Sequence, residues 1–326
     1  MIVGNEGGTN IGDSLRRAAI AVGWKVLFCD ARLANGSWVW LRRISWHCFD
    51  HRPLRLRAFG RSLDITAEEE NPRIMISTGL APITKELLLT LKARGMKCIH
   101  YSTDDPWNPA QRASWFIRSL QAYDKVFSAR RANLEDFRRA GCREVEFLPF
   151  AFDPELFFPD RCPHQSVDFD LIFVGGADND RARVFTGIVA SGLRVALYGD
   201  YWDRYESLRK YYRGRAEGAL LRRVTGAAPV NICLCRRANR DGHVMRSFEI
   251  PACGGFAIAE DTEEHREIFG EEGECVLYFA NGREAVEKTR WALQHPDERL
   301  RMSGAAYRRI VSGGHTYGDR LREMLA

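Results

Sequence analysis

The sequence contains no long apolar segment. None of its hydrophobic runs approaches the ~18–20 consecutive apolar residues that a membrane-spanning helix requires. The first residues, MIVGNEGG, lack the basic stretch and the apolar core of a signal peptide. We therefore expect a cytoplasmic protein.

Paired cysteines are also missing. The nine cysteines are an odd number, and their spacing matches neither a disulfide framework nor a zinc site. Cys233 and Cys235 alternate along an apolar run, so both are expected to point into the core. His47 and His51 lie one helical turn apart, but no third ligand follows them. We predict reduced, buried thiols and no metal site.

An excess of charge of one sign is absent as well. The chain has 48 basic and 43 acidic residues and a net charge of +5. A nucleic-acid-binding protein would need a larger and more clustered excess of basic residues. The mild positive charge is compatible with an anionic ligand such as a nucleotide diphosphate.

The 326 residues suffice for two domains, and the two halves of the chain open in the same way. Each half begins with a short apolar strand, a glycine-rich loop and a helix, at residues 1–21 and from residue 168 onwards. Residues 152–164 are rich in proline and lack periodicity, which is typical of a linker. The pattern predicts an α/β protein built from two βαβ domains, at residues 1–155 and 165–312.

Other short apolar runs predict further buried strands. These runs lie at residues 25–29, 74–77, 97–101, 124–128, 144–149, 194–199, 230–235, 256–259 and 275–279. Helical periodicity predicts helices at residues 13–21, 205–223, 283–295 and 297–313, with a final helix beginning near His315.

The first glycine-rich loop, residues 5–12, has several interpretations. Gly7, Gly8 and Asn10 precede a helix whose N-terminus favours anions, so they are candidates for a ligand site. The glycines do not follow the G-x-G-x-x-G spacing of dinucleotide-binding proteins, and Asp30 comes too early for that motif. A tight turn that requires glycine is the structural alternative.

Two adjacent acids follow the predicted strand at residues 97–101. Polar residues at the carboxyl end of a parallel strand face the ligand crevice of an α/β protein. Asp104 and Asp105 are therefore candidates for a general base or for a sugar-hydroxyl contact. The structural alternative is that one of these acids caps the turn before Pro106, which is a frequent role of Asp at such a position.

Residues 38–63 interleave aromatic residues with arginines. Such a segment can bind a membrane surface or a phosphorylated acceptor, which makes a peripheral membrane contact one hypothesis. The alternative is an amphipathic helix that packs on the sheet and keeps its arginines in water.

The most informative stretch of the sequence is residues 239–264. It carries two carboxylates, Asp241 and Glu249, and then a glycine pair that is typical of a helix C-cap. The apolar run at residues 256–259 predicts a buried parallel strand. Because proline is tolerated in the first turn of a helix, Pro251 predicts that this helix begins near Arg246 or later. Asp241 would then lie on a loop.

Two arginines near these elements are candidate phosphate ligands. Arg181 follows the loop that contains Gly175 and Gly176, and an arginine at a helix start can clamp a diphosphate. Its alternative is a solvent-exposed position. Arg246 lies between the two acids and either offsets their repulsion or binds phosphate.

The pattern Asp241, seven residues, Glu249 and then Ile-Pro-Ala-Cys-Gly resembles the nucleotide-sugar site of retaining GT-B glycosyltransferases. Those proteins have Glu, seven residues, Glu and then Ala-x-Ala-Cys-Gly, so Asp241 departs from the pattern. The chain is most similar to CgeB-like, "glycosyltransferase family 1-like" proteins, in which Arg-x-Phe-Glu-Ile-x-Ala-Cys-Gly is typical. The Ser102–Asn108 segment also looks like an element of these proteins.

The resemblance implies a fold and an assignment of the two domains. It implies two Rossmann-like domains that face a central cleft, with a C-terminal crossing helix at residues 313–326. The donor would bind the second domain, at Gly175, Gly176, Arg181, Arg246, Glu249, Thr262 and Glu263. Asp241 would hold the hydroxyls of the transferred sugar, and the loop with Gly7, Gly8 and Asn10 would line the acceptor side.

The resulting hypothesis is a metal-independent glycosyltransferase without a cofactor. It would transfer a sugar from a nucleoside diphosphate sugar to an unidentified acceptor: a glycan, a lipid-linked glycan, a protein or a small molecule. Glu249 has two acceptor oxygens that suit a ribose diol. His243 is expected to be exposed, and Glu263 and Glu264 either meet the sugar or cap a helix. The alternatives are a catalytically silent nucleotide-sugar binding protein and a nucleotide-sugar epimerase of the same fold.

Overall fold

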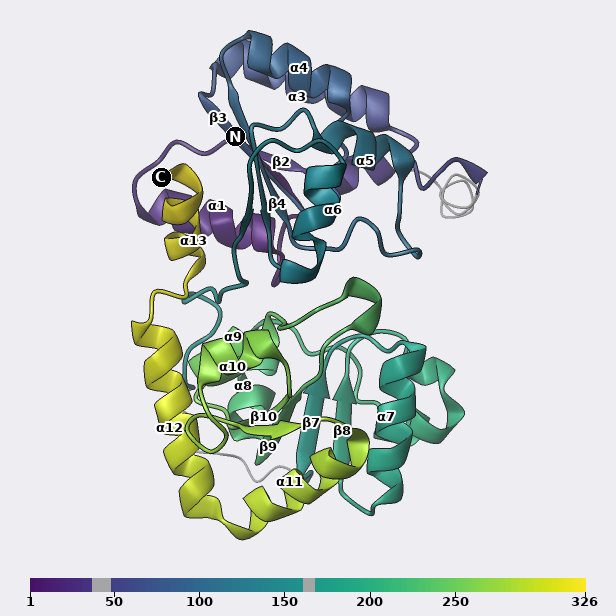
Figure 1. Cartoon of the computed structure of the whole chain (residues 1–326), viewed down its shortest axis with the longest axis vertical. Helices are drawn as coiled ribbons and strands as arrows, with labels where there is room; N and C mark the ends of the chain where they lie inside the picture. Colours follow the sequence, from purple (N-terminus) through teal and green to yellow (C-terminus); the bar gives the residue numbers. More distant parts are fainter. Residues whose placement is uncertain (37–47, 161–167) are drawn as a thin grey trace. The chain divides into compact units, whose positions relative to one another are not determined.

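The computed structural model describes residues 1–36, 48–160 and 168–326. The described residues do not include the first part of the aromatic and arginine-rich segment, residues 38–47, which contains His47. They also do not include the end of the predicted linker. The chain forms two compact units (Figure 1). Unit 1 contains Met1–Pro149, Ala238–Arg240 and Tyr317–Ala326, and unit 2 contains Phe150–Arg237 and Asp241–Thr316.

Unit 1 is built on a six-stranded parallel sheet with the strand order β2-β1-β3-β4-β5-β6. The strands are β1 (Ile2–Gly4), β2 (Phe28–Asp30), β3 (Ile74–Thr78), β4 (Lys97–Ser102), β5 (Lys125–Ser128) and β6 (Val145–Phe147). The helices are α1 (Ile11–Ala21), α3 (Leu56–Glu70), α4 (Lys85–Ala93), α5 (Ser114–Leu120), α6 (Leu134–Arg139) and α13 (Tyr317–Leu325). The described part of the aromatic and arginine-rich segment therefore ends inside an amphipathic helix, α3, which buries Phe59 and Leu63.

Unit 2 is built on a five-stranded parallel sheet with the strand order β11-β10-β9-β7-β8. The strands are β7 (Leu171–Val174), β8 (Val195–Tyr198), β9 (Val230–Cys233), β10 (Ala257–Glu260) and β11 (Leu277–Phe279). The helices are α7 (Asn179–Ala190), α8 (Gly218–Ala227), α9 (Arg246–Ala252), α10 (Glu263–Phe269), α11 (Gly282–Gln294) and α12 (Pro296–Ser312).

Short apolar strands and side-chain caps define unit 2. The strands β7, β9 and β10 are almost entirely buried, as expected for a parallel sheet covered by helices. Asp178, Thr262 and Asn281 cap α7, α10 and α11, because each side chain accepts a hydrogen bond from a backbone N–H of the first turn. The helices pack in pairs, α7 with α11 and α9 with α12.

The helix α9 ends as its glycines predict. Gly254 has a φ of +75°, the N–H of Gly254 donates to the carbonyl of Pro251, and the N–H of Gly255 donates to that of Ile250. These two bonds form a Schellman motif, which satisfies the last carbonyls of the helix. The position of Pro251 differs from the prediction, because it is the sixth residue of α9 and not part of the first turn. Because proline has no backbone N–H, α9 lacks the hydrogen bond that another residue at this position would donate to the carbonyl of Ser247.

The chain passes between the units four times, after Pro149, Arg237, Arg240 and Thr316. The segments at the first and the last crossing pair with each other in unit 2, where the N–H of Phe152 donates to the carbonyl of His315. After Thr316 the last helix, α13, packs on α1 of unit 1. No helix of the described residues is long and apolar enough to cross a membrane.

Candidate functional site

The candidate site of unit 2 lies at the carboxyl ends of its strands. In parallel sheets this edge carries the loops that bind ligands. The loops after β7, β8 and β9 and the first turns of α9 and α10 meet there. Each of the predicted donor residues belongs to one of these segments or, in the case of Arg181, to the first turn of α7.

The glycines after β7 allow a close approach of two loops. A Cβ on Gly175 would lie 2.7 Å from the ring of Phe173, and a Cβ on Gly199 would overlap the carbonyl of Gly175. Gly199 also has a φ of +122°, which L side chains rarely adopt. The backbones of the loops after β7 and β8 therefore touch, and Gly176 follows directly in this tight arrangement.

Arg181 is buried, with only 7% of its surface exposed, so its solvent-exposed alternative is wrong. Its guanidinium donates to the carbonyls of Gly176, at 3.0 Å, and Leu234, at 3.1 Å. Burial lowers the pKa of Arg181, and the charge of the neighbouring Arg236 acts in the same direction. Its Nε also lies 3.9 Å from Oδ2 of the half-buried Asp178, which balances part of its charge. A buried arginine at the ligand edge is a suitable partner for an anion.

Arg246 and Glu249 form an ion pair in the first turn of α9. Glu249 is 1% exposed, and Nε of Arg246 also donates to the carbonyl of Val174, the last residue of β7, at 3.2 Å. The pair thus connects α9 to the β7 edge of the sheet. The predicted start of the helix near Arg246 is confirmed.

Asp241 lies on the loop after β9, as predicted. Its carboxylate accepts a hydrogen bond from the N–H of Arg236 at 3.2 Å, and its own N–H donates to the carbonyl of Arg236 at 3.3 Å. This exchange closes the loop of residues 236–241. The side chain is half-buried and stands five residues before the first turn of α9.

His243 is fully buried, so the expectation that it is exposed is wrong. Its Nε2 accepts the N–H of Phe150 at 3.0 Å, and its Nδ1 lies 2.6 Å from Oε2 of Glu264. A backbone N–H can only donate, so Nε2 carries no proton and Nδ1–H donates to the carboxylate. Glu264 also packs on Gly242, where a Cβ would overlap its carboxyl group. Glu264 therefore holds the loop, while Glu263 is exposed.

A second histidine, His265, ties α10 to α9. Its Nδ1 donates to the carbonyl of Glu260 at 2.7 Å, and its Nε2 accepts from the hydroxyl of Ser247 at 2.8 Å. Burial lowers the pKa of His265 to about 4, so the ring is neutral at physiological pH. The hydroxyl of Thr262 adds a third tie, because it donates to the carbonyl of Gly242. Asp241 and Glu249 therefore stand on a loop and a helix that α10 fixes in place.

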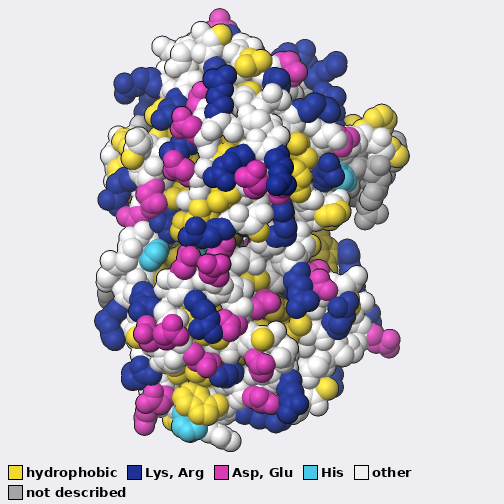
Figure 2. Space-filling view, viewed as in Figure 1, with side chains coloured by type: hydrophobic (Ala, Val, Ile, Leu, Met, Phe, Trp, Pro, Cys, Tyr) yellow, Lys and Arg dark blue, Asp and Glu magenta, His cyan; other side chains and the backbone are white. Residues whose placement is uncertain are grey.

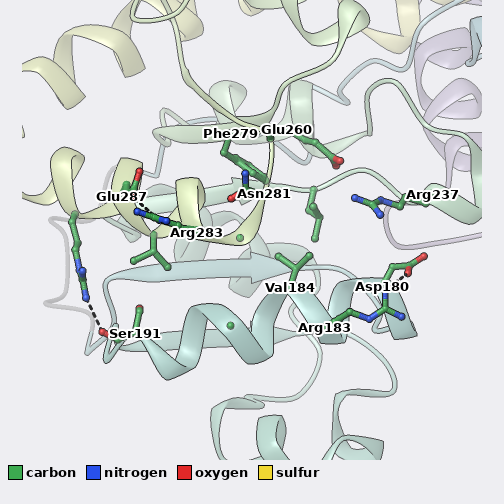
Figure 3. Close-up of a pocket in the computed structure, with 16 residues that line it drawn as sticks. Asp180, Arg183, Val184, Ser191, Arg237, Glu260, Phe279, Asn281, Arg283 and Glu287 are labelled. Carbon is green, nitrogen blue, oxygen red and sulfur yellow. Dashed lines mark hydrogen bonds and ion pairs between the residues drawn. The ribbon is translucent and has the colours of Figure 1, made fainter.

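A cavity of about 560 Å³ lies beside this site, between α7 and α11. Figure 3 shows Glu260, Phe279 and Asn281 along one wall and Val184 of α7 along the other. The cavity reaches the strand edge at Leu234, Arg237 and Glu260. None of the predicted donor residues lines it.

The burial of Glu260, the last residue of β10, can be tested through the pH dependence of stability. Its carboxylate accepts the N–H of Cys235 at 3.0 Å, and burial raises its pKa. A raised pKa stabilises the fold fully below the unfolded pKa, and this contribution disappears as the pH rises through the folded pKa. We expect Glu260→Gln to have a higher Tm than the unmodified protein at pH 7–8, with the difference vanishing towards pH 4, in thermal unfolding across this range. The exposed Glu287→Gln on the same cavity should show no such pH-dependent difference.

In unit 1 the glycine-rich loop forms the turn before α1. Gly7 and Gly8 have φ values of +77° and +58°, and a Cβ on either would meet no atom within 4 Å. The amide of Asn10 donates to the carbonyl of Gly7 at 2.7 Å. The space around the two glycines is therefore empty, and the hydrogen bond from the Asn10 side chain closes the turn.

Asp104 and Asp105 have different surroundings within unit 1. Asp105 is 1% exposed and binds the guanidinium of Arg240, with an Nε–Oδ2 distance of 2.6 Å. It also caps the next turn by accepting the N–H of Trp107 at 3.1 Å, which was the structural alternative. Asp104 is half-buried and stands beside Gly79. Asp105 thus has a structural partner that the sequence did not indicate, since Arg240 comes from the loop after β9.

The surface of the protein carries charged side chains of both signs, and its other potential ligand groups are scattered. Figure 2 shows basic and acidic side chains mixed over the face in view, in agreement with the balanced charge. Among the described residues, no group of three or more His, Cys, Asp or Glu side chains is arranged to hold a metal ion. The cysteines that could be described are all free thiols.

The C-terminal part of the chain is similar in sequence to a known protein family. Residues 181–326, from the first turn of α7 to the last residue, match the family model described as "Glycosyl transferase-like". No curated protein matches the chain.

Solved structures share the fold over nearly the whole chain. Sucrose-phosphate synthase from Thermosynechococcus elongatus has a TM-score of 0.68 at 13% identity, covering 99% of this chain and 93% of that one. Alr3699/HepE from Anabaena, in complex with UDP-glucose, has a TM-score of 0.66 at 11% identity, covering 99% and 98%. A structure described as trehalose-6-phosphate from E. coli bound with UDP-2-fluoro glucose has a TM-score of 0.63 at 12% identity, covering 99% and 98%. At these identities the likeness concerns the fold, and the predicted GT-B fold is confirmed.

Proposed function

We propose that this GT-B chain, glycosyl transferase-like in its C-terminal part, is a glycosyltransferase that uses a nucleoside diphosphate sugar as donor. The observation that carries the proposal is the ion pair between the half-buried Arg246 and the buried Glu249 at the start of α9, beside the end of β7. A buried carboxylate next to an arginine at the ligand edge supplies acceptors for hydroxyls and a cation for phosphate. Both residues lie within the matched residues 181–326.

The reaction breaks the bond between the sugar and the diphosphate, so negative charge develops on the leaving group. Arg181 and Arg246 are the cations that we assign to this charge. Arg181 is buried, its hydrogen bonds go to the carbonyls of Gly176 and Leu234, and the carboxylate of Asp178 lies 3.9 Å from its Nε. Fixed cations in a water-poor site stabilise a developing charge without reorganising during the reaction. We propose that these arginines replace a divalent metal ion, in which case chelation by EDTA leaves the activity unchanged.

The remaining groups are assigned by their chemistry. Glu249 accepts hydrogen bonds from the ribose diol, and Asp241 accepts them from hydroxyls of the transferred sugar. The acceptor is assigned to unit 1, where Asp104 is the candidate general base and Gly7, Gly8 and Asn10 form an open loop. Asp105 binds Arg240, the residue that precedes Asp241 in the chain.

The donor series to test begins with uridine nucleotides, because two of the structures with this fold contain UDP-glucose or UDP-2-fluoro glucose. A thermal-shift screen with UDP, GDP, dTDP and CMP donors detects binding, since a ligand that binds only the folded state raises Tm. The donor that binds is then incubated with the protein, and its hydrolysis and transfer products are identified.

Each alternative predicts a distinct product. A transferase releases the nucleoside diphosphate, and Glu249→Ala suppresses that release. A silent binding protein raises its Tm with the donor but leaves the donor intact. An epimerase changes the sugar while it stays attached to the nucleotide. Binding with no turnover of any donor contradicts the transferase proposal.

A further inference from the structure

The loop after β8 holds a tyrosine in a strained conformation. Tyr201 has a φ of +72° and a ψ of 4°, in the left-handed region. This region is uncommon for residues other than glycine, asparagine and aspartate, and it costs a bulky side chain about 1–2 kcal/mol. A glycine would adopt the same backbone without strain. The fold of the loop therefore gives no reason for a tyrosine.

The strained residue is anchored at the ligand edge of unit 2. The N–H of Ala177 donates to the carbonyl of Asp200 at 2.8 Å, which ties the loop to the glycine loop after β7. The N–H of Gly199 donates to the carbonyl of Gly214 at 2.9 Å, and Asp200 binds Arg215 at 2.6 Å. The two residues before Tyr201 are thus held in place, and the N–H of Arg204 donates to the carbonyl of Tyr201 itself at 3.3 Å.

The ring of Tyr201 is half in solvent. It is 51% exposed, so burial in the core does not explain its presence. The guanidinium of Arg204 lies 4.1 Å from the ring centroid and covers one face. An exposed aromatic ring that is backed by a cation is a suitable platform for another planar ring.

The order of the strands gives the order in which Tyr201 and the other proposed donor-binding groups follow one another along the sheet edge. Along the edge of the sheet, Asp241 follows β9, Gly175 and Gly176 follow β7, and Tyr201 follows β8, and these three strands are neighbours in the order β9-β7-β8. If Asp241 contacts the transferred sugar and the β7 loop contacts the diphosphate, the nucleoside extends towards β8.

We propose that Tyr201 stacks on the nucleobase of the donor and that the strain in its backbone is retained for this contact. The inference rests on the proposed function, because it assumes a nucleotide donor. Strain that persists at an exposed position, where a smaller residue would relieve it, is typical of functional sites. Stacking on an aromatic ring tolerates different bases, so Tyr201 contributes affinity for nucleotides more than selection among them.

The test compares the unmodified protein with Tyr201→Gly and Tyr201→Phe by calorimetric titration with UDP, GDP and inorganic pyrophosphate. We expect Tyr201→Gly to bind both nucleotides about ten-fold more weakly, the effect of one lost stacked base. Its affinity for pyrophosphate, which has no base, should be unchanged, and its Tm should not fall because glycine relaxes the backbone. Tyr201→Phe keeps the ring and should bind like the unmodified protein.

Several results would overturn the assignment. Equal nucleotide affinity in Tyr201→Gly shows that the ring does not contact the base. An equal loss of pyrophosphate affinity shows that the substitution disturbs the phosphate loop, and a loss in Tyr201→Phe assigns the effect to the hydroxyl. If the unmodified protein binds no nucleotide, the proposed function fails together with the inference. If it binds nucleotides and Tyr201→Gly does so equally well, the inference alone fails.

Discussion

Replacing Glu249 with glutamine is expected to weaken donor binding by about 10- to 150-fold. Hydrogen bonds to a charged group contribute about 1.5–3 kcal/mol each, and the substitution removes the charge while preserving the shape of the side chain. Glu249 is 1% exposed, so solvent screens its interactions little. The substitution also deprives Arg246 of its ion-pair partner, and this arginine is one of the two cations assigned to the diphosphate.

The measurement is the dissociation constant of the donor that the thermal-shift screen identifies, together with kcat and KM for its turnover. Glu298→Gln on α12 is the matched control, since Glu298 also pairs with an arginine three residues away but is half-exposed. The control should behave like the unmodified protein. Donor affinity that is equal in Glu249→Gln and in the control would remove Glu249 from the donor site.

The candidate site is largely predictable because it depends on local patterns. The glycine pair after Cys253 indicated the end of α9, and the Schellman motif has the predicted position. The apolar run before Glu260 indicated a buried parallel strand, observed as β10. In both cases the deciding interactions join residues a few positions apart, so the sequence alone contains the necessary information.

The contacts that position the site come from distant parts of the chain, and the sequence could not indicate them. His243 is buried because it binds Phe150, 93 residues earlier, and Glu264, 21 residues later. Asp105 binds Arg240, 135 residues away. A histidine or an aspartate on a loop looks the same in the sequence whether or not such a partner exists.

Strand lengths and irregular turns account for the other differences. β2 is predicted at residues 25–29 but spans Phe28–Asp30, because it pairs only with β1, a strand of three residues. Residues 205–223 are predicted as a helix but form a 3₁₀ turn, Glu206–Tyr211, and then α8 from Gly218. Between them Gly214, with a φ of +86°, interrupts the helical backbone.

The largest expected loss of stability follows from replacing His243 with alanine. The substitution leaves the carboxylate of Glu264 buried without its histidine and the N–H of Phe150 without its acceptor. Leaving a buried donor or acceptor without its hydrogen bond costs about 1–3 kcal/mol, and more for a charged group such as the Glu264 carboxylate. For a unit of this size that corresponds to a fall in Tm on the order of 10 °C. Urea unfolding measures the free energy, and His295→Ala, at an exposed histidine before α12, should change it by less than about 1 kcal/mol.

The double variant His243→Ala with Glu264→Gln distinguishes two contributions to the loss of stability. One is the lost hydrogen bond between His243 and Glu264, and the other is the cavity left by the missing ring. If the carboxylate that has lost its histidine causes most of the loss, neutralising it recovers part of the stability, and the double variant is more stable than the sum of the single effects predicts. Contacting residues typically show coupling energies of about 0.5–3 kcal/mol, and we expect a value within this range. Strictly additive effects would show that the histidine acts by packing alone. Since Glu264 also packs on Gly242, next to Asp241, we expect His243→Ala to weaken donor binding as well and the double variant to recover part of this affinity.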